Sequence, residues 1–153
     1  MVVGASREVA DLDLEPSPFG EDEAKIVDQF VGSVTSDEFI RRISSERFRA
    51  EGGHVGFANV KGKKLVRAGV AVDGAGTIER AMIAGDMHVS PPDAMDRVAN
   101  ALIGANAADR EDLLSRVRGV FSEPDVVQPD AAAGITPEDV VEAVSRAAKE
   151  ATA

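Results

Sequence analysis

The chain has 153 residues, a formal net charge of −10 and a pI of about 4.6. A length of this order predicts one domain, with room for an additional arm. The acidic surface would repel phosphates, so nucleic acid is not expected as a partner. The sequence has no apolar run close to the ~20 residues that a membrane span requires.

The composition also narrows the possible chemistry. Hydrophobic residues make up 44% and charged residues 29% of the chain, which is typical of a globular protein. Cysteine is absent, which excludes disulfides and thiolate chemistry. No basic stretch followed by an apolar core opens the sequence, so we expect no secretory signal and a cytoplasmic location. A salt-rich cytoplasm and an arginine-rich bacterial composition both remain open as reasons for the acidic charge.

The first part of the chain predicts an acidic lead-in and a helical arm. Residues 1–20 carry acidic side chains together with Pro16, Pro18 and Gly20, which indicates an extended lead-in. Apolar residues at helical spacing predict an amphipathic helix over 21–31 that ends at Gly32. Thr35 or Ser36 is then expected to cap a second helix. The buried stripe of that second helix would be Phe39, Ile40 and Ile43.

The middle of the chain predicts strands. From His54 to Met87 the sequence is rich in Val, Ile and Gly, and the apolar residues alternate between Val66 and Val72. Residues 73–76, Asp-Gly-Ala-Gly, predict a tight turn. The returning segment 77–84 alternates less regularly, so we expect a bulge there. The pattern predicts an antiparallel meander of two or three strands.

Three helices are predicted after the strands. Ser90 is expected to cap the first one, which Gly104 can end. The second is predicted from Asp109 to Phe121, and a Pro- and Ala-containing connection follows it. The third is expected to open with Thr136-Pro137 and to bury Val140, Val141 and Val144.

Strands followed by helices predict an α+β fold. We expect a small antiparallel sheet with helices packed on one face, preceded by a helical N-terminal arm. The expected organisation is an acidic lead-in and arm over residues 1–50 and an α+β domain over residues 51–153.

Side chains suited to catalysis or metal binding are few. The sequence has two histidines, His54 and His88, and neither is near a Gly-x-Ser-x-Gly turn. Asp86 and His88 could share one side of a strand end, but two potential ligands do not complete a tetrahedral metal site. We therefore expect no catalytic group and no metal site in this chain.

Two short segments stand out as candidate contact sites. Lys61, Lys63, Lys64 and Arg67 form the one concentrated basic cluster in the sequence. A solvated hairpin end and a contact for an acidic partner or a nucleotide phosphate are both open interpretations.

The other segment is the Gly85-Asp86 pair. Gly85 permits a sharp change of direction at a strand end, and Asp86 can accept hydrogen bonds from nearby backbone N–H groups. We interpret this pair as a structural corner.

Several short motifs occur in an order that resembles a known family. They are Lys61-x-Lys63-Lys64-Leu65-Val66-Arg67, Asp73-Gly74, Ile83-Ala84-Gly85-Asp86, Pro91-Pro92, Leu102-x-Gly104 and Gly134-Ile135-Thr136-x-x-Asp139-Val140-Val141. This pattern resembles the C-terminal accessory domain of lipoate-protein ligases, which is a separate small subunit in some organisms. The resemblance covers about residues 52–150. The chain departs from the family at Met87-His88, where the family tends to place two aromatic residues, and residues 1–50 find no counterpart.

The resemblance implies a function that composition could not. It implies a non-catalytic accessory subunit that supports lipoyl-adenylate formation by a separate lipoate-protein ligase catalytic subunit, its partner in a heterodimer. Lipoyl acceptor domains would be partners only indirectly. ATP, Mg²⁺ and lipoate are then cofactors and substrates of the assembled ligase, and this chain alone binds none of them. The Arg-Arg…Gly-Gly loop and the essential lysine of the catalytic domain have no counterpart in this sequence.

Two other classes of function were weighed. A scaffold or adaptor of a sulfur- or cofactor-assembly pathway would have a similar fold, but such scaffolds bind iron or sulfur through thiolates, which this chain lacks. An independent small enzyme would have to use Lys63, Asp86 or His88, and the spacing of these residues does not indicate one.

Overall fold

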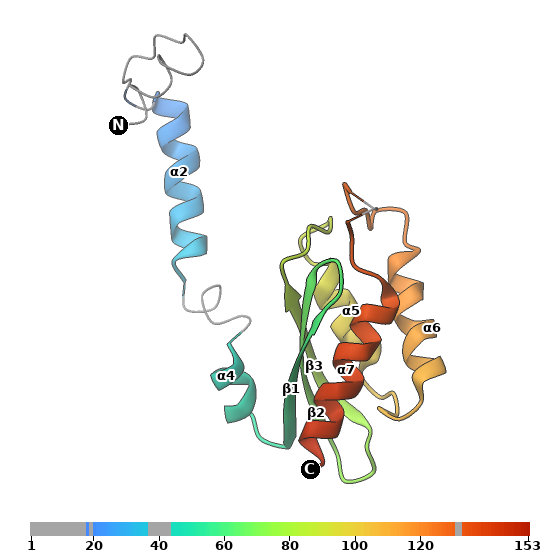
Figure 1. Cartoon of the computed structure of the whole chain (residues 1–153). Helices are drawn as coiled ribbons and strands as arrows, with labels where there is room; N and C mark the ends of the chain where they lie inside the picture. Colours follow the sequence, from blue (N-terminus) through green and yellow to red (C-terminus); the bar gives the residue numbers. More distant parts are fainter. Residues whose placement is uncertain (1–17, 19, 37–43, 131–132) are drawn as a thin grey trace, which may run out of the picture. The chain divides into compact units, whose positions relative to one another are not determined.

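The computed structural model describes residues 18, 20–36, 44–130 and 133–153 (Figure 1). The chain divides into two compact units, Met1–Arg42 and Ile43–Ala153. We call the second one the sheet unit. Each unit is described by itself.

The described part of the first unit is dominated by one amphipathic helix, α2 (Glu21–Val34). Its apolar side chains, Ile26, Val27, Phe30, Val31 and Val34, are exposed. Gly32 lies inside the helix, so the prediction that it ends the helix is wrong. One glycine costs a helix only about 1 kcal/mol, which does not stop the last turn from forming. The second predicted helix, with Phe39, Ile40 and Ile43, falls outside the described residues.

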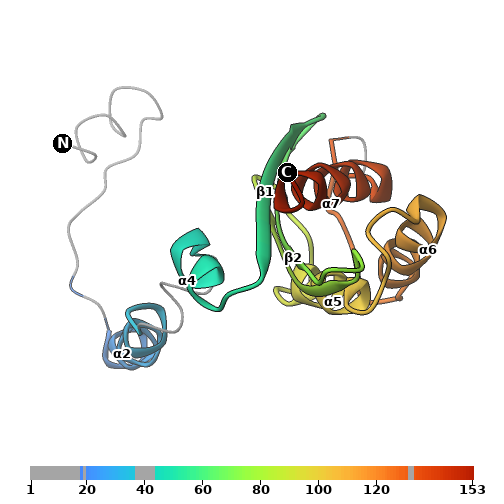
Figure 2. The ribbon, with the colours of Figure 1, turned by 90° about the horizontal axis from the view of Figure 1, so that it is seen from below.

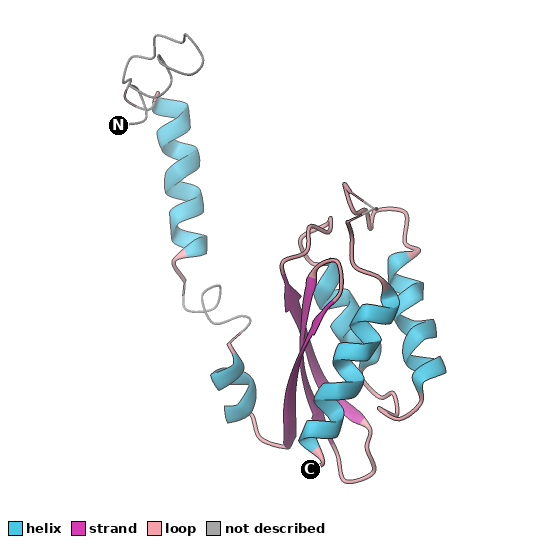
Figure 3. Ribbon diagram, in the orientation of Figure 1, coloured by secondary structure: helices cyan, strands magenta, loops and turns pink. Residues whose placement is uncertain are grey.

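The sheet unit contains the predicted meander (Figure 3). Strands β1 (His54–Lys61), β2 (Leu65–Val72) and β3 (Ile78–Gly85) are antiparallel in the order β1-β2-β3. Ala71 pairs with Arg80 and Val72 pairs with Ile78, which leaves Glu79 as an extra residue in β3. The expected bulge is therefore confirmed.

Three helices follow the sheet, as predicted: α5 (Ala94–Leu102), α6 (Arg110–Phe121) and α7 (Pro137–Ala151). They lie on one side of the sheet in Figure 2, with α7 packed on β1 and β2, α5 on β3, and α6 against both helices. The α+β fold class is confirmed. In the described part of the chain, no helix combines the length and apolar character needed to cross a membrane.

The core lies between the sheet and these helices. Alternate residues of β2 point into it, because side chains of a strand point to opposite faces. The expected valines of α7 are fully buried there. The larger fully buried side chains are Val66, Val70, Val72, Ile78, Val98, Leu102, Leu113, Val117, Val140, Val141 and Val144.

The opposite face of the sheet is covered in part by a short helix, α4 (Ser45–Ala50) (Figure 2). Its Phe48 is 9% exposed and meets Phe57 of β1 edge to face, with ring centroids 5.8 Å apart. The guanidinium of Arg80 lies 4.7 Å from the centre of the Phe48 ring and donates to the Phe48 carbonyl at 3.0 Å. These contacts make α4 part of the sheet unit.

Helix capping agrees with the prediction at α7 and differs from it at α5. Thr136 and Asp139 form a capping box at α7, and the Asp109 carboxylate caps α6 by accepting from the Asp112 N–H at 3.0 Å. Ser90 is not the cap of α5, so that prediction is wrong. Its backbone pairs instead with Val127 in a short antiparallel bridge, and Asp93 occupies the cap position.

A basic corner as the candidate functional site

Three segments that are far apart in the sequence meet at one end of the sheet. They are the β1–β2 hairpin over 61–65, the end of β3 at Gly85 with Asp86, and the first turn of α7. We call this place, with the side chains of Lys61, Lys63, Lys64, Arg67, Asp86 and Asp139, the basic corner. It brings together the basic cluster and the Gly-Asp pair that the sequence singled out separately.

Asp86 ties the end of β3 to the start of β2. Its carboxylate accepts a hydrogen bond from the Leu65 N–H, and its own N–H donates to the Leu65 carbonyl at 3.2 Å. The Lys61 ammonium lies 3.4 Å from the same carboxylate. The Leu65 N–H and, to a smaller extent, the charges of Lys61 and Lys64 hold the pKa of Asp86 below its ordinary value. The exposed ion pair adds little stability, because solvent screens it.

Gly85 is required by close packing and not by its backbone dihedral. Positive φ occurs at Gly52, Gly53, Gly76 and Gly104 in the described residues, so a positive φ at Gly85 is not found. A Cβ on Gly85 would overlap the Leu65 carbonyl oxygen and would lie 2.6 Å from the terminal methyl carbon of Met87. The strands can approach at this point only because the side chain is absent.

The first turn of α7 joins the basic corner through Gly62. A Cβ on Gly62 would lie 2.8 Å from an Asp139 carboxylate oxygen, so the hairpin backbone passes directly beside this side chain. Asp139 accepts from the Thr136 N–H at 3.0 Å and from the Thr136 hydroxyl at 2.8 Å. The sequence predicted the capping box but not its contact with the hairpin, because that contact needs the tertiary fold.

The corner presents more positive than negative charge. Lys61, Lys63 and Arg67 are exposed and Lys64 is half-buried. Arg67 pairs with Asn59 and Ala84 across the sheet. Its neighbours in β2 point into the core, so its own side chain lies on the face away from α5 and α7. Four cations face two carboxylates here, on a chain whose net charge is −10. Such a surface can attract an acidic group or an acidic partner.

The two histidines lie apart from each other and are exposed. His54 begins β1 and pairs with Val72, at the end of the sheet opposite the corner, while His88 lies in the segment before α5. The described residues contain no group of three or more His, Asp or Glu side chains arranged to hold a metal ion.

The fold and the corner define a small α+β protein with a cluster of basic side chains at one end of its sheet. Comparison with protein-family models and with curated proteins finds no match. A chain of one solved structure is similar: it is 27% identical, the match covers 59% of this chain and 93% of that one, and the TM-score is 0.49. That structure is of an archaeal lipoylation system, a bi-partite lipoate protein ligase and its E2 lipoyl domain from Thermoplasma acidophilum.

Proposed function

We propose that this chain is the non-catalytic accessory subunit of a two-subunit lipoate-protein ligase. In this role it supports the formation of lipoyl-adenylate by a separate catalytic subunit, which then lipoylates acceptor proteins. The catalytic subunit holds ATP, Mg²⁺ and lipoate, and this chain contributes a surface that completes the closed active site.

One observation carries the proposal. Three separate pieces of the family-like pattern, Lys61–Arg67, Ile83–Asp86 and Gly134–Val141, make direct contact at the basic corner. Two glycines of these pieces stand where a side chain would collide with a neighbouring piece, at Gly62 with Asp139 and at Gly85 with Leu65. The pattern therefore describes one coherent surface in three dimensions, which favours a resemblance that extends to function.

The basic corner is the proposed contact with the catalytic subunit. The outer edge of β1 is a weaker candidate, because the Phe57 N–H already donates to the Glu150 carboxylate of α7 at 2.8 Å. At the corner the exposed cations of the hairpin offer charge complementarity to an acidic partner surface, which speeds encounter and fixes orientation. A subunit that closes over an active site excludes water and fixes geometry without donating a catalytic group.

The test is a reconstitution of the two half-reactions. Pyrophosphate release from ATP, Mg²⁺ and lipoate is measured with the catalytic subunit alone, with this chain alone and with both. We expect no release by this chain alone and a strong increase when both are present. Transfer from preformed lipoyl-adenylate to an acceptor domain should depend much less on this chain. Release by this chain alone, or no increase in the mixture, would refute the proposal.

A further inference from the structure

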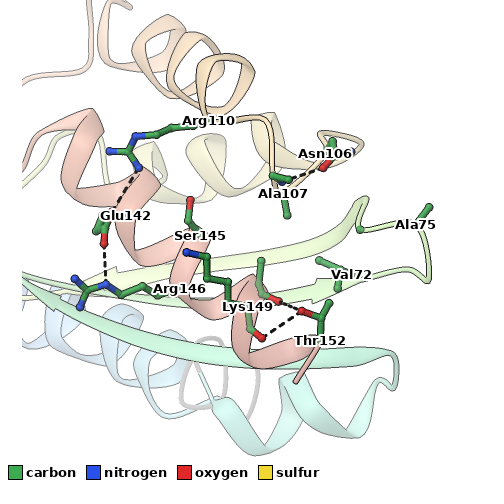
Figure 4. A pocket seen from close by; sticks show the side chains of 13 residues that line it. Val72, Ala75, Asn106, Ala107, Arg110, Glu142, Ser145, Arg146, Lys149 and Thr152 are labelled. Atoms are coloured by element: carbon green, nitrogen blue, oxygen red, sulfur yellow. Dashed lines mark hydrogen bonds and ion pairs between the residues drawn. The ribbon is translucent and has the colours of Figure 1, made fainter.

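A pocket of about 540 Å³ lies on the helix side of the sheet unit, at the end opposite the basic corner. Its walls come from the C-terminal half of α7, the β2–β3 turn and the segment that leads into α6 (Figure 4). The volume falls within the ~300–1,000 Å³ that is common for small-molecule sites. Neither the sequence pattern nor the proposed function assigns a role to this place.

Cations from two helices line one side of the pocket (Figure 4). Arg146 and Lys149 come from α7, and Arg110 comes from the first residue of α6. Glu142 is the acidic side chain in the lining, so three positive charges face one negative charge. This concentration on a chain of net charge −10 was not visible in the sequence, because 36 positions separate Arg110 from Arg146.

Glu142 orients the two arginines and leaves most of their donors available. Its carboxylate lies 2.8 Å from Nε of Arg146 and 3.4 Å from a terminal nitrogen of Arg110 (Figure 4). A guanidinium has five N–H donors in a fixed fork, so each arginine keeps further donors for a ligand. Lys149 makes no ion pair within 4.0 Å in the described part of the chain and is therefore a third available cation.

The rest of the lining is small, apolar or hydroxylic. Val72, Ala107 and Ala148 supply apolar surface, and the side chains of Ser145 and Asn106 add polar groups beside it. Asp73, in the adjacent turn, is directed inward: its carboxylate accepts from the Ala75 and Thr77 N–H groups at 2.9 and 2.7 Å. These two bonds hold the carboxylate at the turn.

We propose that this pocket binds a small phosphorylated molecule through its phosphate groups. Arginine forks match the tetrahedral oxygens of phosphate, and three cations suit a diphosphate better than a single carboxylate. The apolar wall would hold an organic body attached to the phosphates. The inference goes beyond the accessory role, because it concerns binding by this chain alone.

The experiment measures binding to the whole chain by NMR chemical-shift titration, at low salt and without divalent metal. The probes are pyrophosphate, ADP and adenosine. We expect pyrophosphate and ADP to shift the amide signals of Ser145 and Lys149, and adenosine to leave them unchanged. Tighter binding of ADP than of pyrophosphate would show that the apolar wall contacts the organic part of the ligand. Equal binding would identify free diphosphate as the ligand. Adenosine binding as tightly as ADP would overturn the proposal.

Two double variants locate the binding. Arg146→Gln with Lys149→Gln removes two cations and should weaken pyrophosphate binding by about tenfold or more, since about tenfold corresponds to the loss of a single charge-assisted contact. Lys63→Gln with Lys64→Gln removes the same charge at the basic corner and should change the affinity by about twofold or less, since the corner and the pocket lie at opposite ends of β2, roughly 23 Å apart. Equal weakening by both variants, or shifts confined to the hairpin, would overturn the proposal.

Two variants that each remove a negative charge provide a second test, because one of them should raise the affinity. Glu142→Gln removes the carboxylate that competes for Arg110 and Arg146, so it should tighten pyrophosphate binding by about threefold or more. Glu138→Gln is the matched control on the same helix, because Glu138 pairs with Arg118, does not line the pocket and acts on Arg110 only as a minor charge interaction, so its effect should be smaller. No tightening in Glu142→Gln, or the same tightening in both variants, would refute a specific site. Thermal unfolding of each variant confirms that it is folded.

Discussion

Gly56 of β1 lies directly beneath Ala147 of α7. A Cβ on Gly56 would overlap the Ala147 carbonyl oxygen and would lie 2.5 Å from the backbone nitrogen of Ala151. The Glu150 carboxylate closes the same contact by accepting from the Phe57 N–H at 2.8 Å. Helix α7 can therefore cross β1 at backbone distance, which brings its C-terminal half over the sheet and positions the wall of the phosphate pocket.

The contact predicts that Gly56→Ala destabilises the sheet unit. The new methyl group has to push α7 away from β1, and overpacking of this kind typically costs about 1–3 kcal/mol or more. Urea denaturation measures the loss. Gly119→Ala is the matched control, because a Cβ there meets no atom within 4 Å and replacing a helical glycine stabilises by roughly 0.5–1 kcal/mol. Equal stability of Gly56→Ala and the wild type would show that α7 does not lie at this distance.

Local signals in the sequence predicted the three strands and the three helices that follow them, but they predicted neither helix α4 nor the long-range contacts. The Asp73–Gly76 turn and the Thr136 capping box are each specified by a few neighbouring residues, so their outcome agreed with the pattern. The prediction that Ser90 caps α5 was wrong because a tertiary pairing of Ser90 with Val127 competes with local capping. Gly56 carried a signal that could have been used, since a glycine inside a strand often marks a close backbone approach. The sequence carried no signal for the pocket, because its cations come from separate helices.

The candidate site was predictable in parts. The residues of the hairpin and of the Gly-Asp pair were both singled out, but their mutual contact depends on β2 and β3 pairing in register, with Val66 opposite Gly85. Periodicity fixes which residues share a face of a strand, while register follows from the turn and the bulge. The participation of Asp139 could not be deduced, because it requires the path of α7 over the sheet.

A truncated chain that begins at Ser44 keeps helix α4 together with the rest of the sheet unit, and it should fold. Helix α4 belongs to the sheet unit, since Phe48 packs on Phe57 and Arg80 binds the Phe48 carbonyl. A chain that begins at Gly52 loses these contacts and should be less stable by about 2–3 kcal/mol, the value of burying one large aromatic side chain. Thermal and urea unfolding compare the three chains. Equal stability of the two truncated chains would contradict the packing role of α4.

Asp86 should make stability depend on pH in the acid range. Its pKa is lowered in the folded protein, chiefly by the Leu65 N–H, so the ionised form is favoured by folding. The stabilisation is therefore fully present above the unfolded pKa of about 3.9 and is lost as the pH falls through the folded pKa.

Asp86→Asn should be less stable than the wild type at pH 7, and the difference should shrink below about pH 4. The amide oxygen can still accept from the Leu65 N–H, but without charge assistance. Urea denaturation at neutral and acid pH measures both differences. Asp73→Asn serves as a comparison, because it removes another turn carboxylate that accepts from a backbone N–H, that of Thr77. A difference that does not vary with pH would mean that the charge of Asp86 is unimportant. If Asp86→Asn is folded and binds the catalytic subunit but adenylation is abolished, Asp86 is more than a structural residue.

Reversal of charge at the basic corner should weaken the assembled ligase. Lys63→Glu with Lys64→Glu changes the local charge by four units at the hairpin end, where an acidic partner surface would then be repelled. We expect weaker association with the catalytic subunit by calorimetry, a lower association rate at low salt and a parallel loss of adenylation. Arg146→Glu with Lys149→Glu makes the same change of charge at the opposite end of the sheet unit, so it should leave association nearly unchanged. The side chains of the hairpin are outside the core, and thermal unfolding should stay close to the wild-type value in both variants. Unchanged association of the hairpin variant would mean that the interface is not at the basic corner. Equal weakening by both variants would mean that the overall net charge, and not a local contact, causes the effect.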